Sequence, residues 1–480
     1  MPDVTLAEQL GAFAATSTFD GLPADVVASV RQRVLDTLGI CVAASSLDTS
    51  AAARAYAAAQ GGTEQAHAVG MVGQCPATVA AFVNGVLAHS LDYDDTHLPS
   101  IVHPSASVIP SALAAGEEVG AGGGTVIAGI ACGLEVCVRL GMAGYDASSG
   151  SSVYFDHGQH ATSICGALGA AVAAARVYGF DAAGITNALG VAASMGSGII
   201  EANRAGGTVK RMHCGWAAHA GVSAAQLVHY GFTGPPTVLE GRFGFFEAWL
   251  HGRFDASAVT GGLGSQWAVP GIFFKPYPAN HFTHTAIDAG AGLRRRGVDP
   301  GEIESMELGV AGPIVRTIGE PIDVKRAPET GYMAQFSGPY AVVAGLLGGG
   351  GLGVGLDDFT DALARDPRRR QLMGRVTVVE DAACTAAFPH QFPSVLRARL
   401  QGGSEVEERV MTNWGGPDRP LGDGDLATKF EDNARRALAP EAVAEVESLV
   451  TGLDTLEDMG RLLAPLGAAS ANSRPGGKGT

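Results

Sequence analysis

Apolar residues recur at helical spacing along about the first 265 positions of the chain. Leu6, Leu10 and Phe13 fall on one face of a predicted helix, and a second helix is predicted from Pro23 to about Gly39 because apolar residues repeat there every three or four positions. The same spacing predicts further helices over residues 77–91, 108–119, 161–178, 183–195 and 215–230. The last three are rich in Ala and Gly, so we expect these helices to pack closely.

The pattern changes after Trp267. Short runs of β-branched and alternating residues predict strands over residues 303–310, 375–379 and 395–400, with helices between them over residues 287–294 and 339–347. Apolar residues again recur at helical spacing over residues 425–438 and 440–453, which predicts two further helices. The expected fold is therefore mainly α with an inserted α+β domain. We expect a helical domain over residues 1–268 and 406–467, the inserted domain over residues 269–405, and a disordered Ser/Gly/Pro/Lys-rich tail over residues 468–480.

Composition narrows the classes of partner. The chain has 480 residues, of which 46% are hydrophobic and 17% charged, so it can bury a large core. A net charge of −16 argues against nucleic acid or an acidic membrane as partner, and the longest basic run, residues 368–370, is expected to be a solvated helix end. No apolar run approaches the length that spans a bilayer, and no targeting segment is recognised. The expected location is the cytoplasm.

The seven cysteines are scattered through apolar or Gly-rich surroundings. An odd number in so long a chain does not suggest a disulfide framework, so we expect most of them to be buried and reduced. Cys132 and Cys137 form the only close pair, which without a CxxC element is a poor metal or iron-sulfur site. We therefore expect these cysteines to hold no metal and no iron-sulfur cofactor.

Titratable side chains are concentrated in one short stretch, residues 89–97, which runs His-Ser-Leu-Asp-Tyr-Asp-Asp-Thr-His and is followed by His103-Pro104-Ser105. Neighbouring Asp and His side chains can shift each other's pKa values, as acid-base catalysis near neutral pH requires. A solvated loop or a helix N-cap is the alternative, since Asp and Thr are common there. The stretch lies between two predicted helices, where rigid elements could position catalytic groups.

Three further segments carry candidate chemistry. His160 opens the helix predicted from residue 161, where it either lies beside free backbone N–H groups that favour an anion or simply caps the helix. Lys210 and Arg211 follow a Gly turn and could hold carboxylates, or could be a surface basic pair. Lys275 begins a Lys-Pro-Tyr-Pro loop whose two prolines restrict where the lysine points, which suits a ligand clamp.

Taken together and in this order, these segments resemble the MmgE/PrpD family from about residue 6 to residue 453. Further matching segments are Gly215-Trp216-Ala217-Ala218, residues 231–235, residues 334–340 and residues 425–430. The resemblance implies a discontinuous all-helical domain, a smaller inserted lid domain, a site between them and a homodimer. It also implies metal-free chemistry on a small-molecule polycarboxylate, because the family dehydrates 2-methylcitrate, decarboxylates cis-aconitate or epimerises iminodisuccinate.

The resemblance also implies site residues. Family site positions fall on residues that the chemistry had already singled out: Asp92, Thr96, His103, His160, Lys210 and Lys275. We expect catalytic roles for His103, His160, Asp92 and Lys210, and substrate-binding roles for Thr96, Arg211, Lys275, Asn280 and His281. In a dehydratase one imidazole would remove the proton beside a carboxylate, the other would protonate the leaving hydroxyl, and the lysines would hold carboxylates.

Two departures from the family pattern bear on the reaction. Cis-aconitate decarboxylases that resemble this pattern carry a histidine five positions after the clamp lysine, where this chain has Asn280 followed by His281. Gln159 replaces an aromatic residue that many relatives have, and His157 adds an imidazole. We therefore expect a metal-independent dehydratase, a hydro-lyase of a small hydroxy polycarboxylate such as 2-methylcitrate.

Other functions remain open on the sequence. An epimerase of an amino- or imino-dicarboxylate would use the same acid-base pair, and a decarboxylase of a cis-aconitate-like acid would use the same cations. A non-catalytic helical scaffold would require the site residues to be lost, yet most are present. A metal hydrolase using His97 and His103 fits no familiar zinc spacing.

Overall fold

The computed structural model describes residues 4–148 and 150–469, and it divides the chain into two compact units. Unit 1 comprises the chain up to Ile272 and again from Phe430, whereas unit 2 is formed by the intervening segment, Phe273–Lys429. Most of the described chain is helical, with a small sheet in its C-terminal half. The domain limits expected from sequence, at residues 268 and 405, remain a prediction.

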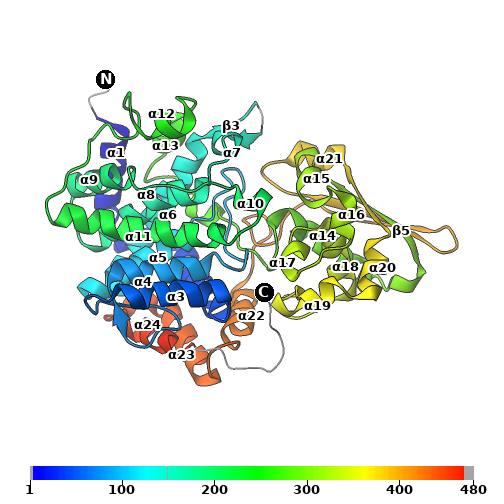
Figure 1. The fold of residues 1–480 in the computed structure, drawn as a ribbon. Coiled ribbons are helices and arrows are strands. Elements are labelled where there is room, and N and C mark those ends of the chain that lie inside the picture. The colour runs from blue at the N-terminus through cyan, green and yellow to red at the C-terminus, as the bar shows by residue number, and fades with distance from the viewer. Residues whose placement is uncertain (1–3, 149, 470–480) are drawn as a thin grey trace. The chain divides into compact units, whose positions relative to one another are not determined.

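Unit 1 is built almost entirely of helices (Figure 1). Its α-helices are α1 Leu6–Thr16, α2 Ala24–Ala44, α3 Asp48–Gln60, α4 Ala77–Ala88, α5 Ser105–Val119, α6 Gly123–Ala143, α7 Val153–Asp156, α8 Ala161–Val177, α9 Ala182–Ala192, α10 Ala202–Ala205, α11 Val209–His229, α12 Phe245–Leu250, α13 Ala256–Thr260, α23 Pro440–Thr451 and α24 Gly460–Leu463. Short 3₁₀ turns and strand pairs connect them: η1 Phe19–Gly21, η2 Val269–Gly271, η6 Leu453–Thr455, η7 Ala464–Ala468, β1 Ala66–His67 with β2 Gln74–Cys75, and β3 Tyr145–Asp146 with β4 Ser151–Ser152. Helix α22, Asp423–Ala434, crosses from unit 2 into unit 1.

Small residues let the central helices of unit 1 approach each other, and Figure 1 shows α4, α5, α8 and α11 side by side. A Cβ on Gly221 of α11 would lie 2.4 Å from the Cβ of Ala170 in α8, and one on Gly215 would lie 2.4 Å from the Phe82 carbonyl oxygen in α4. Any larger side chain would therefore force the helices apart. These two contacts hold α4 and α8 closely against α11.

Several helix boundaries differ from those predicted by sequence, and the two largest differences are in α2 and α11. Helix α2 continues past Gly39 to Ala44, because Gly39 is not a helix end but a contact point: a Cβ there would lie 2.9 Å from the Phe430 ring. Helix α11 begins at Val209, not at Gly215. Lys210 and His213 consequently sit on the first two turns of a helix and not in the preceding loop.

Helix α6 is long and apolar enough to cross a membrane by length and composition, with a mean hydropathy of 1.8 over 18 residues. This corrects the expectation that no apolar run approaches that length. In the structure 94% of that window is buried inside the protein, as in a core helix. Its one buried ion pair, Glu135 with Arg139 at 2.6 Å, holds the segment after α13: Arg139 donates to the Gly261 and Gln266 carbonyl oxygens, and Glu135 accepts from the Ala268 N–H.

Unit 2 contains a four-stranded sheet in the order β6-β5-β7-β8, in which only β5 and β6 are parallel. Its elements are η3 His281–Thr283, α14 His284–Arg295, η4 Pro300–Glu302, β5 Ile303–Val310, α15 Gly312–Ile318, α16 Ile322–Arg326, α17 Gly331–Ala334, α18 Gly338–Leu347, η5 Leu356–Asp358, α19 Asp361–Ala364, α20 Pro367–Met373, β6 Val376–Glu380, α21 Ala382–Ala387, β7 Ser394–Leu400 and β8 Glu405–Val410. Helices α14 and α18 pack on this sheet. The edge strand β8, which sequence did not predict, continues the sheet past residue 405.

Three further expectations from the sequence concern the basic run, the cysteines and the C-terminal tail. The run at residues 368–370 is not wholly solvated: Arg369 is buried, with its guanidinium over the Tyr340 ring, because α20 turns that side chain inward. Six of the seven cysteines are buried, as expected from their apolar surroundings. The predicted disordered tail lies from residue 470 outside the described residues, whereas Ala468 still belongs to η7.

Candidate active site

Four imidazoles meet where the ends of four unit 1 helices come together. His89 follows the end of α4, His103 precedes α5, His160 precedes α8, and His213 lies on the second turn of α11. The ring centroids are 5.4 Å apart for His89 and His103, 5.6 Å for His89 and His160, and 4.9 Å for His160 and His213. We call these four residues the histidine cluster.

Three helix N-termini open at this cluster, those of α5, α8 and α11. Their N-cap residues, Pro104, His160 and Thr208, supply no side-chain cap. The first N–H groups of a helix lack partners within the helix, and the helix dipole places partial positive charge there. Three of these groups are already used: the Ser105 N–H donates to Asp95, the Ser163 N–H to the His160 carbonyl oxygen and the Arg211 N–H to the Thr208 carbonyl oxygen. The arrangement favours an anion, such as a substrate carboxylate, near the remaining ones.

Asp94 lies between two members of the cluster. Its carboxylate accepts from Nδ1 of His89 at 2.7 Å and lies 3.9 Å from Nδ1 of His103. The bond orients His89, whose Nε2 is buried and has no hydrogen-bond partner among the residues that the structure describes.

His103 is held in one tautomer by its neighbours. Its Nδ1 lies 2.7 Å from the backbone oxygen of Asp95 and 3.2 Å from the Thr96 hydroxyl. A carbonyl oxygen can only accept, so Nδ1 carries the proton and Nε2 of the neutral ring carries the lone pair. The side chain of His103 is 13% exposed, whereas that of His89 is fully buried. His103 is thus the member of this pair that is accessible to a small molecule.

His160 and His213 form a direct pair, with 2.9 Å between their Nδ1 atoms. Burial lowers the pKa of His160 well below its usual range, and the neighbouring charges of His89, His213, Lys210 and His103 lower it further. Burial, with His89 and Lys210, lowers the pKa of His213 to about 4. Both imidazoles are consequently neutral at pH 7 and able to accept a proton.

This neutrality predicts acid sensitivity of the fold. The unfolded chain protonates these histidines as the pH falls below about 6.5, the ordinary pKa of histidine, while the folded protein does not. Stability should therefore fall with pH from about 6.5 toward about 4, by up to about 1.4 kcal/mol per pH unit for each histidine. Urea unfolding at several pH values checks this. The free energy of unfolding should change less steeply with pH in His213→Gln than in the unsubstituted protein. An unchanged slope in that variant would contradict it.

Asp95 has a structural role beneath the cluster. Its carboxylate accepts from Arg33 at 2.7 Å and from both the hydroxyl and the N–H of Ser105. Arg33 also donates to the backbone oxygens of Val269 and Ile272, and both ionic side chains are only 1% exposed. Burial lowers the pKa of Arg33, which Asp95 partly offsets. This ion pair fixes the segment after α4 against α2 and the start of α5.

Asp92 and Lys210 lie at the rim of the cluster. Asp92 has a left-handed backbone, φ 53°, and its carboxylate is 3.9 Å from Nζ of Lys210. Asp92 was expected to have a catalytic role, and Asp94 is the carboxylate that lies beside His89 and His103 here. Arg211 follows Lys210 on the first turn of α11 and is partly exposed.

The remaining sequence candidates, Lys275, Asn280 and His281, belong to unit 2. Lys275 is 1% exposed. His281 is also buried, with its ring 4.6 Å from that of His284. The structure therefore brings Asp92, Thr96, His103, His160 and Lys210 together within unit 1, and the substrate-binding roles of the unit 2 residues remain predictions.

Asn280 has a local structural role. Its side-chain oxygen accepts from the Phe282 N–H at 3.1 Å and so caps η3. We expect Asn280→Ala to lower the free energy of unfolding by about 1 kcal/mol, because it removes the cap, and Asn280→Asp to retain most of it. Thermal unfolding of the two variants checks this. Equal destabilisation by both would show that the cap contributes nothing.

Sequence reasoning did not assign His89, His213 or Arg33 to the site. His213 lies three positions after Lys210, which places both on one helix face, but that signal requires α11 to begin at Val209. His89 was part of the titratable stretch and could have been chosen with His103. Arg33 carried no local signal, because its partner Asp95 is 62 positions away.

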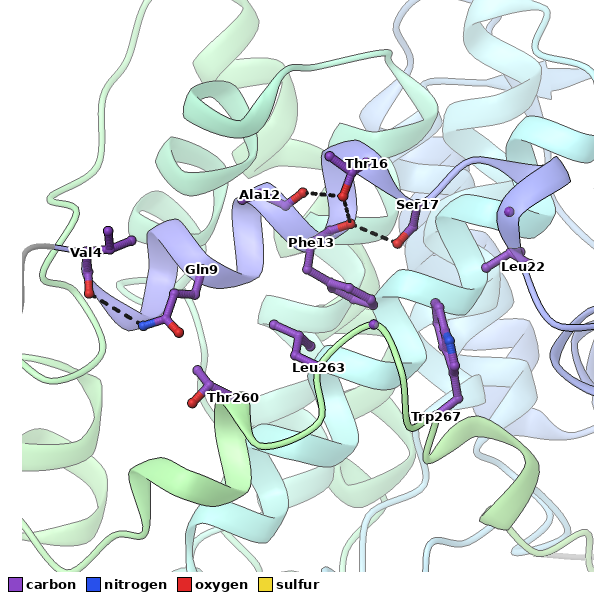
Figure 2. A pocket seen from close by; sticks show the side chains of 12 residues that line it. Val4, Gln9, Ala12, Phe13, Thr16, Ser17, Leu22, Thr260, Leu263 and Trp267 are labelled. Carbon is purple, nitrogen blue, oxygen red and sulfur yellow. Dashed lines mark hydrogen bonds between the residues drawn. The ribbon is translucent and has the colours of Figure 1, made fainter.

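A cavity elsewhere in unit 1 offers no comparable chemistry. It has a volume of about 560 Å³ and lies between α1 and the segment that follows α13. Figure 2 shows Phe13 and Trp267 turned toward each other there, 5.2 Å apart, while the Thr16 and Ser17 hydroxyls donate back to helix carbonyl oxygens. No ionisable side chain is among the residues that line it. Within residues 4–148 and 150–469, no group of three or more His, Cys, Asp or Glu side chains could hold a metal ion.

Comparisons with known proteins bear on the whole chain. The MmgE/PrpD N-terminal domain matches residues 8–257, and the MmgE/PrpD C-terminal domain matches residues 277–455. The chain is 29% identical over 448 residues to a cis-aconitate decarboxylase from Homo sapiens, covering 90% of this chain and 88% of the relative. It is 30% identical over 401 residues to the Mus musculus enzyme of that name, covering 80% of this chain and 76% of that relative.

A more distant relative carries another activity in its name. A 2-methylcitrate dehydratase from Cupriavidus necator is 24% identical over 250 residues, covering 49% of each chain. The two domain matches together span both units and confirm the resemblance inferred from the motifs. The chain belongs to the MmgE/PrpD family.

Proposed function

We propose that this protein is a lyase that removes a proton beside a carboxylate of a small hydroxy polycarboxylate and eliminates water. The observation that carries the proposal is the histidine cluster, which combines neutral imidazoles with imidazoles that contact a carboxylate. Elimination of water needs both a base and an acid. We assign the base to the buried neutral imidazoles and the acid to the imidazoles beside the carboxylate. Dehydration of a 2-methylcitrate-type acid fits this requirement.

His160 is the proposed base. Burial together with the surrounding positive groups keeps His160 unprotonated at pH 7, so its ring has a lone pair that can take the substrate proton. His103 is the proposed acid, because it is accessible and lies beside Asp94, whose charge favours the imidazolium that donates the proton. The leaving hydroxyl would take that proton and depart as water.

Negative charge develops on the substrate carboxylate as the proton leaves. Lys210 and the N-terminal N–H groups of α8 and α11 are the positive groups at the cluster, and fixed positive groups stabilise such charge without reorganising. Asp92, 3.9 Å from Lys210, limits where the ammonium can point. Lys275 as a second carboxylate clamp is part of the proposal.

Decarboxylation of a cis-aconitate-like acid is the second candidate function. The relatives that cover most of this chain are named cis-aconitate decarboxylases, which favours it. Loss of carbon dioxide needs a group that stabilises the resulting carbanion and one acid, both present in the cluster, but no base. Against it, Asn280 stands five positions after Lys275, and its side-chain oxygen is used to cap η3.

The test is a substrate screen with proton NMR. Citrate, 2-methylcitrate, cis-aconitate, tartrate and iminodisuccinate are each incubated with the purified protein, in water and in deuterated water. We expect a new alkene signal from a hydroxy acid. Carbon dioxide released from cis-aconitate would establish the second candidate, and deuterium exchange with racemisation but no alkene would indicate an epimerase. No change in any of the five acids would contradict the proposal.

A further inference from the structure

The two buried imidazoles of His160 and His213 face each other through like atoms. Their Nδ1 atoms are 2.9 Å apart, a hydrogen-bond distance, so one Nδ1 must donate and the other accept. When both rings are neutral, a single proton lies between the two Nδ1 atoms. The donor ring then has a lone pair on Nε2, and the acceptor ring has its proton there.

Both rings are anchored so that this contact persists. The His160 N–H donates to the Gly198 carbonyl oxygen at 3.0 Å, which fixes the start of α8. Ser163, one turn into α8, donates its hydroxyl to the His213 carbonyl oxygen at 3.0 Å and ties α8 to α11. His160 and His213 are each only 4% exposed, so water has little access to the bond.

We propose that His213 is a positioning residue that sets the tautomer of His160, and thereby decides whether Nε2 of His160 accepts or donates a proton. With Nδ1–H on His160, its Nε2 is a base. With Nδ1–H on His213, His160 carries its proton on Nε2 and is an acid. The role switches when the shared proton passes from Nδ1 of His160 to Nδ1 of His213 while Nε2 of His160 gains a proton and Nε2 of His213 loses one, so that both rings stay neutral.

The proton balance is simple. When Nε2 of His160 takes a proton from carbon, the C–H bond breaks and its electron pair stays on the substrate. The Nδ1–H of His160 can then pass to Nδ1 of His213, so that His213 becomes the imidazolium and His160 is neutral again with a proton on Nε2. The pair has gained one proton in all, which it gives back when the product leaves. The direction of the first step rests on the proposed function, whereas the shared proton does not.

The groups around the pair determine its charge. His89 from the end of α4, His103 from the segment before α5 and Lys210 from α11 all face His160 and disfavour a cation on it. His89 and Lys210 act in the same way on His213. Asp94, through His89, and Asp92, beside Lys210, are the nearby carboxylates. The resting pair is therefore neutral, as the shared single proton requires.

The first arm of the test uses the resting full-length protein without substrate. Protein labelled with nitrogen-15 at histidine is recorded by long-range proton–nitrogen correlation at pH 7, and the His160 and His213 signals are assigned by their loss in His160→Gln and His213→Gln. We expect both rings to be neutral and in opposite tautomers. The same tautomer in both rings, or an imidazolium in either, would overturn the proposal.

The second arm compares the isosteric variants His213→Asp and His213→Asn. A carboxylate only accepts, so Asp would lock His160 with Nδ1–H and make it a stronger base. We expect the acidic limb of the kcat/KM profile to move up by about one pH unit or more in His213→Asp and to stay in place in His213→Asn. A merely structural residue would give the same profile in both variants, which would refute the role of His213.

The two arms separate the inference from the function on which it rests. Opposite tautomers with no activity toward any polycarboxylate would leave the shared proton standing and reject the proposed function. Activity toward a polycarboxylate with the same tautomer in both rings would support the proposed function and reject the shared proton. If the Asp variant does not fold, as judged by its thermal unfolding, the measurement on the unsubstituted protein still decides.

Discussion

Replacing His103 by Ala lowers kcat about 10²- to 10⁴-fold without unfolding the protein, which is the range expected when one acid-base group is lost. The imidazole is 13% exposed, whereas that of His89 is fully buried, so His103 is the less disruptive of the two to truncate. Its Nδ1 proton is held by the Asp95 backbone oxygen, and its Nε2 is the atom that would serve the substrate. Steady-state kinetics on the acid identified in the screen, with circular dichroism as the check on folding, measures the effect.

His157→Ala is the matched control for this change. His157 lies three positions before His160 but is exposed, and its ring contacts His251, 4.5 Å away, outside the cluster. We expect the control to retain nearly full activity. A folded His103→Ala variant as active as the control would remove His103 from the mechanism.

The second large effect is on stability. Arg33→Met should lower the free energy of unfolding by about 3–5 kcal/mol, because it leaves the Asp95 carboxylate charged and buried without its partner. Both side chains of this pair are 1% exposed, and Arg33 also satisfies two backbone oxygens. Urea unfolding measures the loss. Arg33→Met with Asp95→Asn should recover part of it, because the uncompensated charge is then absent.

Arg31→Met provides the comparison on the same helix. Arg31 pairs with Asp454 at 3.0 Å, but its side chain is 32% exposed, and ion pairs in such positions contribute about 0–1 kcal/mol. A difference of several kcal/mol between the two variants is expected. Equal losses would mean that burial of the Arg33 pair has no special effect.

The spacing of apolar residues predicted much of the fold, because most helices and strands bury one face and expose the other. The strand Ile303–Val310 was predicted with its observed ends, and α8 to within one residue. The strand β8, Glu405–Val410, was missed since it is an edge strand made of four charged residues and only two valines. The start of α11 was missed because Gly206 and Gly207 resemble a turn that extends into the helix.

The candidate site was predicted in part for a similar reason. His103 and His160 stand next to helix starts, a position that local sequence reveals. The pairing of His160 with His213, and that of Arg33 with Asp95, joins residues 53 and 62 positions apart. Such contacts depend on how α2, α4, α8 and α11 pack, which the spacing of apolar residues does not specify.

The central claim is that His160 removes a proton beside a substrate carboxylate. The most direct measurement is the fate of that proton, followed by proton NMR in deuterated water with the unsubstituted protein and with His160→Gln. The account predicts that the unsubstituted protein removes it and forms an alkene, and that His160→Gln does neither. Turnover that leaves the proton in place, or equal loss of the proton in the folded variant, would contradict the account.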